Sequence, residues 1–502
     1  MARAGRVKWP TGPRTVFFDD VAGSTTLSRA VREGRIRRLA PKIYTADLTS
    51  EAAEIVLANP WRILARLCPG AVVVDRSAAD GGRIVHGVLF VVADTPRQKF
   101  ELPGLEIRVR RGGAVEAPVP DSVWPEGLHM SSAARTLLDN LVTSRGRRGR
   151  VPRTLSRAEL EDWVAGKAIA WGPARLERLC EECHQLAPAL GWTGDLADVD
   201  QLFDQLGGVE PVRRDAGEMF RAFVSGTPWD ERRLELFNTA SAALANLPTE
   251  VPQHLLASEP VGELPFYEAY FSNYIEGTVF TLDEAREIIE SQQPPADRPE
   301  DGHDILGTYR CVVDPVGRAT TSGDPDELIA YLRTRHQTIL AGRPDQGPGE
   351  WKTKPNQVGT YQFVAPELVE GTLRKGLVEM DRLPPGIARA SYVMLVVSEV
   401  HPFTDGNGRV ARVMMNAELS AVGEARIVVP NIFRNEYVSA LRRVLTTDGD
   451  VGGFVTVMAH AWRWTAAMPW ADKAATEGQL EATHALLDST DAQISGVRLT
   501  VP

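Results

Sequence analysis

Hydrophobic and polar positions follow two rhythms, strand-like in the first part of the chain and helix-like in the rest. Between residues 71 and 120 apolar and polar residues alternate, which predicts β-strands. At 156–246 and again at 262–465 apolar residues recur every three or four positions, which predicts helices. We therefore expect a mainly α fold, with an all-helical domain preceded by an α+β region.

One polar turn interrupts the helical part. Residues 351–366 read WKTKPNQVGTYQFVAP, in which β-prone residues flank a turn. This pattern predicts a β-hairpin within the otherwise helical domain. In the C-terminal tail, residues 466–502, the stretch QLEATHALLDS predicts one more helix.

The first 60 residues predict a winged helix-turn-helix. A short helix is expected at 19–22, and Ser24 is a suitable N-cap for a second helix that ends at Gly34. The strands RIRRL and KIYT follow, so the order is helix, turn, helix and basic hairpin. The segment resembles the N-terminal winged helix of AbiE-type antitoxins. That resemblance implies a small α+β domain at 61–143.

Positive charge is concentrated at the same end of the chain. Residues 1–45 hold ten Lys and Arg against three Asp and Glu, a balance of +7, whereas the whole chain carries −10. Such asymmetry indicates that the N-terminal part meets a polyanion, and we expect DNA. The alternative is a solvated basic face on a small helical domain. The expected DNA contacts are Arg29, Arg32, Arg37 and Arg38.

Neither a long apolar run nor a cleavable leader is visible, so we expect a cytoplasmic protein with no membrane partner. Four cysteines are too few for a disulfide scaffold in 502 residues. Cys180, Cys183 and His184 form a C-x-x-C-H string, which suggests covalent haem attachment. The string lies within ARLERLCEECHQLAPAL, however, and an ordinary amphipathic helix is the preferred interpretation.

The stretch HPFTDGNGRVAR (401–412) collects groups suited to polyphosphate chemistry. Pro402 forces His401 out of the preceding apolar helix. The glycines of DGNG predict a tight loop whose backbone N–H groups converge, and a helix begins near Arg409. Loop amides, a helix N-terminus and the guanidinium groups of Arg409 and Arg412 would together cradle phosphates.

Two further groups in this stretch add chemistry to the cradle. Asp405 is a hard oxygen ligand suited to Mg²⁺, and His401 titrates near neutral pH. Together these groups predict phosphoryl or nucleotidyl transfer to a weak nucleophile. A calcium loop is the alternative for DGNG, but Arg409 stands at its third ligand position and argues against it.

The stretch resembles, at every fixed position, the signature of the Fic family, H-P-F-x-[DE]-G-N-[GK]-R-x-x-R. The likeness extends over about residues 262–465, and it implies transfer of AMP from ATP to a Ser, Thr or Tyr hydroxyl of a target protein. It implies that His401 is the general base and that Asp405 binds Mg²⁺. The hairpin would be the flap that holds the target, through Gly359, Thr360 and Tyr361.

The resemblance also assigns the nucleotide site. Arg409 would support the anion site, and Arg412 would pair with the γ-phosphate. The implied nucleotide contacts are Gly406, Asn407, Gly408, Arg409, Arg412 and Tyr437, and the implied catalytic set is His401, Asn407 and Arg409. In FRNEYV (433–438), Phe433 and Val438 depart from the family string N-R-x-x-Y-Y, which puts adenine specificity in doubt. Gly408 fits members that transfer AMP rather than phosphate.

A second string, SNYIEG (272–277), resembles the inhibitory motif of the same family. On a helix, Ser272 and Glu276 lie one turn apart on one face, and Gly277 follows. A carboxylate there could reach Arg412 and occupy the γ-phosphate site. The alternative for Glu276 is a solvated helix acid. Its place before the domain puts the chain in the internally inhibited class.

Five segments are therefore expected: a winged helix at 1–60, an α+β domain at 61–143, a linker and helical connector at 144–261, the Fic domain at 262–465 and a tail at 466–502. The leading hypothesis is an autoinhibited protein adenylyltransferase that uses ATP and Mg²⁺. Two alternatives stay open. One is a DNA-binding transcription regulator whose Fic core senses nucleotide, and the other is an enzyme that removes AMP with the help of Glu276. The target protein and the oligomeric state stay open.

Overall fold

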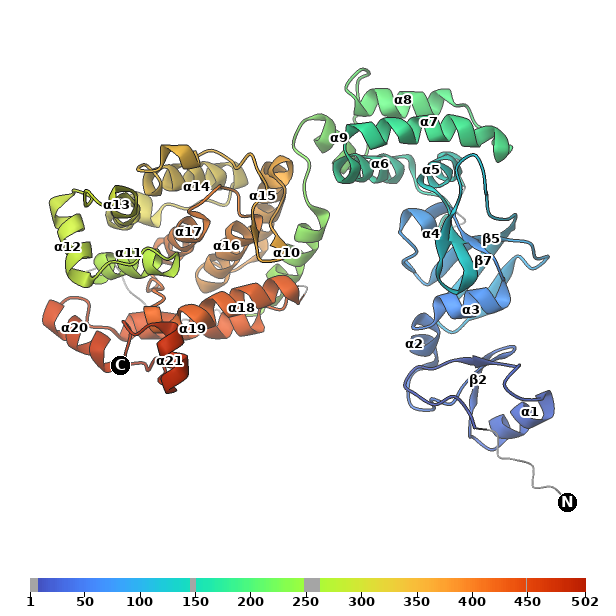
Figure 1. The fold of residues 1–502 in the computed structure, drawn as a ribbon, viewed down its shortest axis with the longest axis horizontal. Coiled ribbons are helices and arrows are strands. Elements are labelled where there is room, and N and C mark those ends of the chain that lie inside the picture. The colour runs from blue at the N-terminus through green and yellow to red at the C-terminus, as the bar shows by residue number, and fades with distance from the viewer. Residues whose placement is uncertain (1–7, 145–149, 248–261, 448) are drawn as a thin grey trace. The chain divides into compact units, whose positions relative to one another are not determined.

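The computed structural model describes residues 8–144, 150–247, 262–447 and 449–502. The chain divides into two compact units, residues 1–225 and 226–502 (Figure 1). The expected basic linker at 144–153 and the end of the expected connector, 248–261, lie partly or wholly outside the described residues. No helix among the described residues is both long and apolar enough to cross a membrane.

Unit 1 begins with a small antiparallel sheet beside one helix. The sheet has the order β1-β3-β2, and its elements with the neighbouring helices are β1 (Phe17–Phe18), α1 (Ser24–Arg32), β2 (Arg37–Ala40), β3 (Ile43–Thr45) and α2 (Ala52–Leu57). The basic hairpin is confirmed, since Arg38 pairs with Tyr44 across it. The helix expected at 19–22 is wrong, because these residues form turns. Four residues are too few to offset the cost of helix nucleation. Gly23, not Ser24, precedes α1 as its N-cap.

The first helix of the expected helix-turn-helix is thus missing, and α1 stands alone before the hairpin. The carboxylate of Asp19, in the turn that replaces it, pairs with Arg66 on α3 (Pro60–Leu67) at 2.5 Å. This ion pair ties the turn to the following segment. Within residues 8–51, α1 is therefore the one helix beside the three-stranded sheet, and the helix pair expected before the hairpin is not present there.

A six-stranded mixed sheet follows, in the order β6-β7-β5-β4-β9-β8. Its strands are β4 (Val72–Val73), β5 (Val88–Ala93), β6 (Lys99–Leu102), β7 (Leu105–Arg111), β8 (Ser122–Trp124) and β9 (Leu128–Met130). β5 is buried along its whole length and runs parallel to β7, with Val91 opposite Val109. Phe18 and Ile43 of the first sheet share one apolar core with Leu89 and Ile107. The segments before and after residue 60 therefore fold around a common core.

Helices complete unit 1. They are α4 (Asp75–Ala79), α5 (Ala133–Leu141), α6 (Arg157–Trp171), α7 (Pro173–Ala189), α8 (Ala197–Leu206) and α9 (Glu218–Val224). Ser156 and Glu159 form a capping box that fixes the start of α6. The C-x-x-C-H string lies inside α7, as the helix interpretation predicts. Cys183 is buried, and its sulfur faces the carbonyl of Ala134 at 3.8 Å, whereas Cys180 is partly exposed.

The regular elements in the described part of unit 2 are helices, apart from one hairpin. Before the hairpin lie α10 (Glu231–Leu244), α11 (Leu264–Ile275), α12 (Leu282–Ser291), α13 (Pro299–Val313) and α14 (Pro325–Ile339). After it lie α15 (Val369–Val378), α16 (Ile387–Val400), α17 (Asn407–Ala421), α18 (Arg434–Thr446), α19 (Gly452–Ala467), α20 (Lys473–Ala482) and α21 (Ser489–Ser495). The expected hairpin is confirmed: β10 (Gln357–Val358) pairs with β11 (Tyr361–Gln362).

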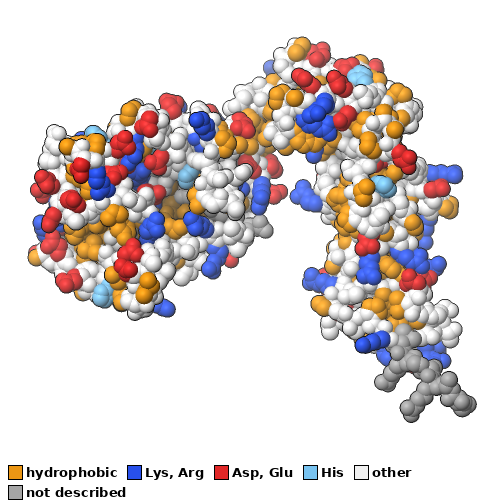
Figure 2. All heavy atoms as spheres, in the orientation of Figure 1, with side chains coloured by type: hydrophobic (Ala, Val, Ile, Leu, Met, Phe, Trp, Pro, Cys, Tyr) orange, Lys and Arg blue, Asp and Glu red, His pale blue; other side chains and the backbone are white. Residues whose placement is uncertain are grey.

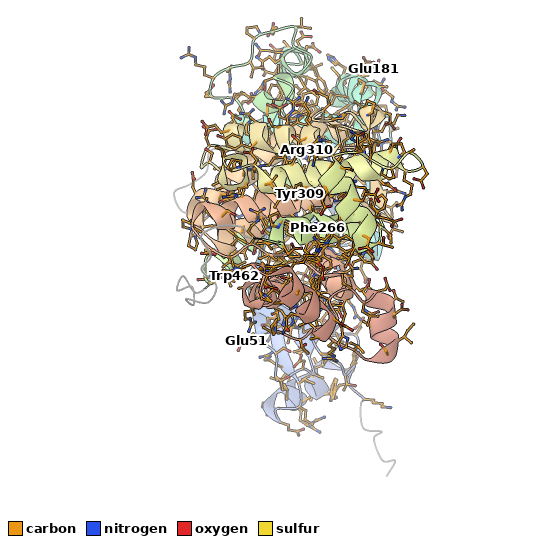
Figure 3. All side chains as sticks on the ribbon, turned by 90° about the vertical axis from the view of Figure 1, so that its left-hand side faces the viewer. Glu51, Glu181, Phe266, Tyr309, Arg310 and Trp462 are labelled. Atoms are coloured by element: carbon orange, nitrogen blue, oxygen red, sulfur yellow. The ribbon has the colours of Figure 1, made fainter. Side chains whose placement is uncertain are left out.

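The core of unit 2 is built around α16 and α17, which pack against each other. Both helices are buried over most of their length, and α17 buries Asn407, Arg409 and Arg412 together with its apolar residues. Phe266 on α11 and Tyr309 on the neighbouring α13 belong to a second apolar cluster (Figure 3). The expected tail helix at QLEATHALLDS is split. α20 ends at Ala482, and Asp488 caps α21 by accepting from the backbone N–H of Thr490.

Candidate functional site

His401 lies where α16 ends and has left the helix, as Pro402 predicts. Its backbone is left-handed (φ 51°, ψ 58°), because Pro402 disfavours a helical residue before it. Its Nδ1 lies 3.2 Å from the carbonyl of Ser398, which can only accept, so Nδ1 carries the proton and Nε2 keeps its lone pair. The ring stacks on Phe363 of the hairpin segment, with centroids 3.8 Å apart. Burial lowers the pKa of His401 to about 4. At neutral pH the ring is therefore an uncharged base.

The loop after His401 is held closed by Asn407. The side-chain oxygen of Asn407 accepts from the N–H of Phe403, and its amide donates to the carbonyl of Phe403, both at 2.9 Å. The side chain is buried and both polar atoms are used. The expected role of the Asn407 side chain in holding phosphate stays a prediction. In this structure Asn407 fixes the shape of the loop.

His336 on α14 supports the same loop from the other side, and the sequence did not single it out. Its ring stacks on Phe403 with centroids 3.6 Å apart. Nδ1 accepts from the N–H of Gly349 at 2.9 Å, so Nε2 is the protonated nitrogen that donates to the carbonyl of Asp405 at 2.9 Å. Burial lowers the pKa of His336 to about 4, in keeping with a neutral ring that bridges two backbone groups.

Gly406 and Asp405 start α17. Gly406 is its N-cap with φ 74°, and a Cβ there would clash with Cδ2 of Leu340, so glycine is required. Asp405 Oδ1 accepts from the N–H of Gly406 at 2.7 Å, and Oδ2 lies 3.3 Å from Arg409. Nearly half of the Asp405 side chain (46%) is exposed. Its remaining lone pairs can take a hard cation, so this donor fits the expected Mg²⁺.

Arg409 is a buried structural cation rather than an exposed one. Its guanidinium forms an ion pair with Asp304 of α13, and it lies 3.4 Å from Oδ1 of Asn273 on α11. Asp304 is fully buried and also pairs with Arg343 at 2.9 Å. Arg409 therefore joins α17 to α11 and α13 beneath the loop. Asp304 was not predicted, because no local pattern marks it.

Arg412 is buried and makes three hydrogen bonds to the end of α11. Its Nε donates to the hydroxyl of Ser272 at 3.0 Å, and Nη2 donates to the carbonyl of Ser272 and to Oε1 of Glu276, both at 2.8 Å. Burial opposes its charge, but pairing with Glu276 outweighs burial and raises the pKa of Arg412. Tyr437, buried beside it on α18, also pairs with this guanidinium. Ser272, Glu276, Arg412 and Tyr437 thus meet at one place.

Glu276 lies against the first turn of α17. It is the C-cap of α11, and Gly277 leaves the helix with φ 92°. A Cβ on Gly408 would clash with Oε1 of Glu276, so the carboxylate occupies the space left by the missing side chain. The N-terminus of a helix attracts anions, and Glu276 is the anion placed there. Arg434, at the start of α18, fixes this end of α11 by donating to the carbonyl of Ile275 at 2.9 Å.

The hairpin presents exposed residues at its turn, as expected of a flap. Gly359 has φ 61°, and both Gly359 and Thr360 are exposed. Tyr361 is also expected to contact a target, and its hydroxyl points inward and donates to Glu399 of α16. The hydroxyl of Tyr361 is therefore engaged inside the protein.

A buried charged cluster lies under the hairpin and was not predicted. Arg233 of α10 pairs with Glu399 at 2.6 Å and donates to the carbonyl of Gln362 at 2.6 Å. Lys352 Nζ donates to Asn356 at 2.7 Å and to the carbonyl of Val400 at 3.3 Å. Burial lowers the pKa of Lys352 to about 8 and raises that of Glu399 to about 7. A glutamate inside the apolar run ASYVMLVVSEV was the one visible signal of this cluster.

Phe433 is one of the two residues that depart from the family string. Phe433 packs near His460 of α19, with ring centroids 5.2 Å apart.

The basic residues expected to contact DNA lie in unit 1. Arg29, Arg32 and Arg38 are exposed, whereas Arg37 is half-buried and donates to the carbonyl of Ser50 at 2.5 Å. Figure 2 shows Lys and Arg side chains around α1 and the first sheet.

Comparisons with known proteins agree with the residues of the loop. Residues 328–419 match the Fic/DOC family. The chain is 26% identical over 270 residues to "Protein adenylyltransferase Fic" of Nematostella vectensis, covering 49% of this chain and 61% of that one. It is 28% identical over 204 residues to "Protein adenylyltransferase fic-1" of Caenorhabditis elegans, covering 39% of each. The matched regions span about half the length of these curated relatives.

Among solved structures, "Fic-1 (aa134 - 508) from C. elegans" has a TM-score of 0.34 and 19% identity, over 66% of this chain and 89% of that one. A Fic domain containing signaling protein from Bacteroides thetaiotaomicron has a TM-score of 0.36 and 18% identity, over 49% of this chain and 97% of that one. The scores are too low to support an argument about geometry. The relationship therefore rests on the sequence matches.

Proposed function

We propose that this chain, a Fic/DOC family protein distantly related to protein adenylyltransferases, transfers AMP from ATP to a hydroxyl of a target protein and is inhibited by Glu276. One observation carries the proposal. A neutral imidazole, an outward carboxylate and an arginine-lined helix N-terminus share the single loop from His401 to Arg412, and an internal carboxylate is bound at that N-terminus.

In the proposed reaction, Nε2 of His401 takes the proton of a Ser, Thr or Tyr hydroxyl. The hydroxyl oxygen bonds to the α-phosphorus of ATP, the bond from that phosphorus to the β-phosphate bridging oxygen breaks, and pyrophosphate leaves. His401 is suited to this step because Ser398 fixes its tautomer and Phe363 fixes its ring plane. Asp405 would hold Mg²⁺, which neutralises phosphate charge when it is bound.

Phosphates would bind at the first turn of α17. The first N–H groups of a helix have no partner within it, and a Cβ on Gly408 in this turn would contact both Glu276 and the guanidinium of Arg412. Arg409 contributes positive charge from beneath, while Asp304 holds it in place. The proposed nucleotide contacts are Gly406, Gly408, Arg409, Arg412 and Tyr437, with Asn407 acting through the shape of the loop.

Inhibition follows from competition for Arg412. The Glu276 carboxylate lies 2.8 Å from Nη2 of Arg412, and a γ-phosphate paired with that guanidinium would need the same position. The Glu276 carboxylate and a γ-phosphate at the same guanidinium would repel each other strongly in a partly buried site. ATP would therefore bind productively only after Glu276 has moved. The exposed turn at Gly359 and Thr360 is the proposed docking point for the target backbone.

Label transfer from α-phosphate-labelled ATP tests this function, with self-modification of the full chain as the readout. We expect label on Glu276→Gly, little on the wild type, and none on Glu276→Gly/His401→Ala. Glu287→Gln, an exposed acid on α12, is the control for a general change of charge and should behave as the wild type. Label on the double variant would contradict the role of His401.

Removal of AMP is the second enzymatic candidate, because Glu276 is placed beside the nucleotide site where it could orient a water. The discriminating comparison uses an AMP-modified protein, prepared with Glu276→Gly, and follows release of AMP. Release by the wild type that disappears in Glu276→Gln would favour removal. No release by either protein would exclude removal, and an equal rate in both would exclude a role for Glu276 in it.

DNA binding with nucleotide sensing is a candidate from another class, favoured by the exposed Arg29, Arg32 and Arg38 beside the hairpin. The helix pair that motivated it is absent from residues 8–60, so any contact would come from α1 and the basic hairpin. Full-length protein should then bind duplex DNA with an affinity that falls steeply with salt. Arg32→Ala/Arg38→Ala should reduce that affinity, and unchanged binding would remove the hypothesis.

A further inference from the structure

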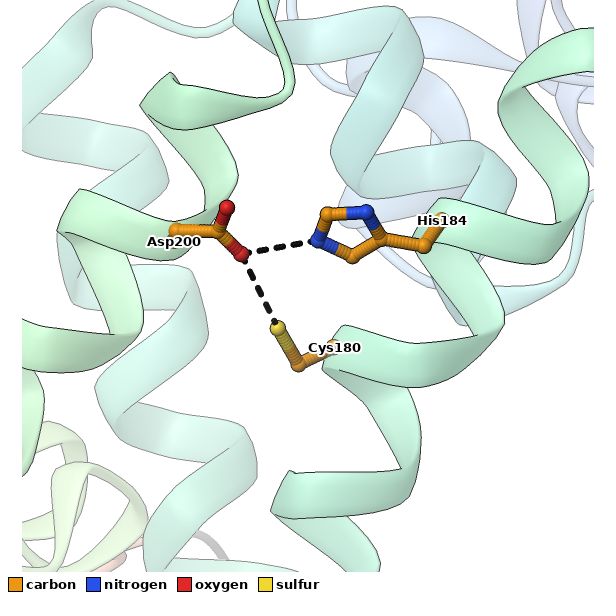
Figure 4. Close-up of side chains that lie close together, drawn as sticks. All are labelled: Cys180, His184 and Asp200. Carbon is orange, nitrogen blue, oxygen red and sulfur yellow. Dashed lines mark hydrogen bonds and ion pairs between the residues drawn. The ribbon is translucent and has the colours of Figure 1, made fainter.

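Three side chains of different chemistry converge between two helices of unit 1, far along the chain from the proposed active site. Cys180 and His184 stand one turn apart on α7, and Asp200 comes from α8 (Figure 4). His184 Nε2 lies 2.7 Å from Oδ1 of Asp200, and the sulfur of Cys180 lies 3.8 Å from the same oxygen. All three donor atoms lie within 4.8 Å of one another.

We propose that Cys180, His184 and Asp200 form a site for a divalent transition metal, with Zn²⁺ the best-matched ion. A Zn²⁺ ion lies about 2.3 Å from sulfur and about 2.0–2.2 Å from nitrogen or oxygen ligands. Tetrahedral ligands at those lengths stand roughly 3.3–3.8 Å apart. The 3.8 Å from the Cys180 sulfur to Oδ1 of Asp200 lies in this range, whereas the 2.7 Å between His184 and Asp200 is a hydrogen-bond distance that must lengthen when an ion enters. The two donors of α7 are spaced i, i+4, which puts them on one face of the helix.

The donor set selects the class of ion. Thiolate and imidazole are ligands of Zn²⁺, Co²⁺ and Cu, whereas Mg²⁺ and Ca²⁺ require oxygen ligands throughout. On binding, the thiol of Cys180 loses its proton to the buffer and the sulfur bonds to the metal. Three protein ligands leave a fourth position for water or for a group from outside. Before an ion binds, the Asp200 carboxylate gives the site a negative charge. This charge attracts the positive ion and favours its binding.

The surroundings of these three side chains argue against haem attachment and against a simple pair of residues. Covalent haem attachment needs both cysteines of the string, but Cys183 is buried and faces the carbonyl of Ala134. If His184 and Asp200 formed only a hydrogen bond with each other, it would not explain why the sulfur of Cys180 also lies next to the Asp200 oxygen. The side chains of His184 and Asp200 are 40% and 52% exposed, so an ion can reach them from solvent. A bound ion would join α7 to α8 across their outer surface.

Cobalt is the probe that tests the proposal, because bonding of Co²⁺ to a thiolate produces a charge-transfer band in the near ultraviolet. The full chain, without a polyhistidine tag, is stripped with EDTA under reducing conditions and titrated with Co²⁺. We expect a charge-transfer band and four-coordinate visible bands that saturate at one equivalent and disappear when one equivalent of Zn²⁺ is added.

Variants assign the ligands. Cys180→Ser should abolish the charge-transfer band, and His184→Gln or Asp200→Asn should weaken Zn²⁺ affinity, measured against a chelating dye, by roughly tenfold or more. Cys183→Ala, which removes a buried sulfur that faces Ala134, and Asp198→Asn, an exposed acid of α8, should leave the spectrum and the affinity unchanged. Circular dichroism checks that each variant is folded. No band in the folded wild type, or a band that survives in Cys180→Ser, would overturn the proposal.

Discussion

Arg412 and Ser272 are joined twice: Nε of the guanidinium donates to the serine hydroxyl at 3.0 Å, and Nη2 donates to the serine carbonyl at 2.8 Å. The serine thus aims the guanidinium at Glu276, 2.8 Å away. We expect Ser272→Ala to loosen this arrangement, because a buried donor is left without its partner at a cost of about 1–3 kcal/mol.

Self-labelling by Ser272→Ala should therefore rise above the wild type but stay below Glu276→Gly. The double variant Ser272→Ala/Glu276→Gly is the control, because it should label no faster than Glu276→Gly alone if the serine acts through the same carboxylate. Additive increases would show that Ser272 acts elsewhere. The comparison is made with initial rates of self-labelling at saturating ATP.

The effect of Gly408→Ala on stability should change sign with the residue at 276. In the wild type, the new Cβ would clash with Oε1 of Glu276, so we expect a lower melting temperature. In Glu276→Gly the clash is gone, and alanine in the first turn of α17 should stabilise by about 0.5–1 kcal/mol. Differential scanning calorimetry of the four proteins gives the comparison. The same sign in both backgrounds would place Glu276 away from Gly408.

The pH dependence of AMP transfer should lack the usual histidine step. Burial lowers the pKa of His401 from 6.5 to about 4, so the proton-free base persists as pH falls through 6.5 and is lost only near pH 4. Transfer by Glu276→Gly should therefore show no loss centred at pH 6.5. An NMR titration with the ring carbons of histidine labelled, assigned with His401→Ala, checks the shift directly. A midpoint near 6.5 would contradict it.

The same shift has a consequence for stability. A neutral buried histidine binds fewer protons in the folded state than in the unfolded state between pH 6.5 and about 4. The contribution of His401 and His336 is thus fully present above pH 6.5 and is lost as pH falls toward 4. His336→Asn can keep the acceptor for Gly349, and it should reduce the slope of the unfolding free energy against pH in that window. Urea titrations at pH 5, 6 and 7 measure the slope.

Tyr361→Phe should loosen the hairpin. Its hydroxyl donates to buried Glu399, and removing that bond leaves the carboxylate with Arg233 alone, at a cost of about 1–3 kcal/mol. Amide hydrogen exchange in a peptide spanning 351–366 should become faster. Thr360→Ala, which changes an exposed neighbour, is the matched control and should leave exchange unchanged. Equal protection in Tyr361→Phe would show that the hydroxyl does not hold the hairpin.

The sequence predicted those features of the site that depend on residues close together in the chain. Pro402 and the DGNG glycines predicted the break after α16 and a following helix. His401 does leave the helix, and α17 begins at Asn407, two residues before the expected Arg409. The spacing of Ser272 and Glu276 predicted one helix face, and the two side chains do share Arg412.

The partners that come from distant segments were not predictable in this way. Asp304 under Arg409 and His336 under the loop lie about 100 and 70 residues from the groups that they hold. Nothing in a single chain's periodicity marks such contacts, since a buried acid or imidazole interrupts an apolar face at only one position. The helix expected at 19–22 failed for the opposite reason. A favourable local pattern was too short to outweigh the turn anchored by Asp19.

Arg233 decides where this protein can be cut. It lies on α10, near the start of unit 2, yet it holds the carbonyl of Gln362 and the carboxylate of Glu399. A shortened protein that begins at residue 262 would keep every position of the signature and of the inhibitory string. It would nevertheless lose the cation that neutralises Glu399, and with it an anchor of the hairpin. A truncation at residue 226 keeps the domain whole. A truncation at residue 262, guided by sequence similarity alone, removes the helix that carries Arg233.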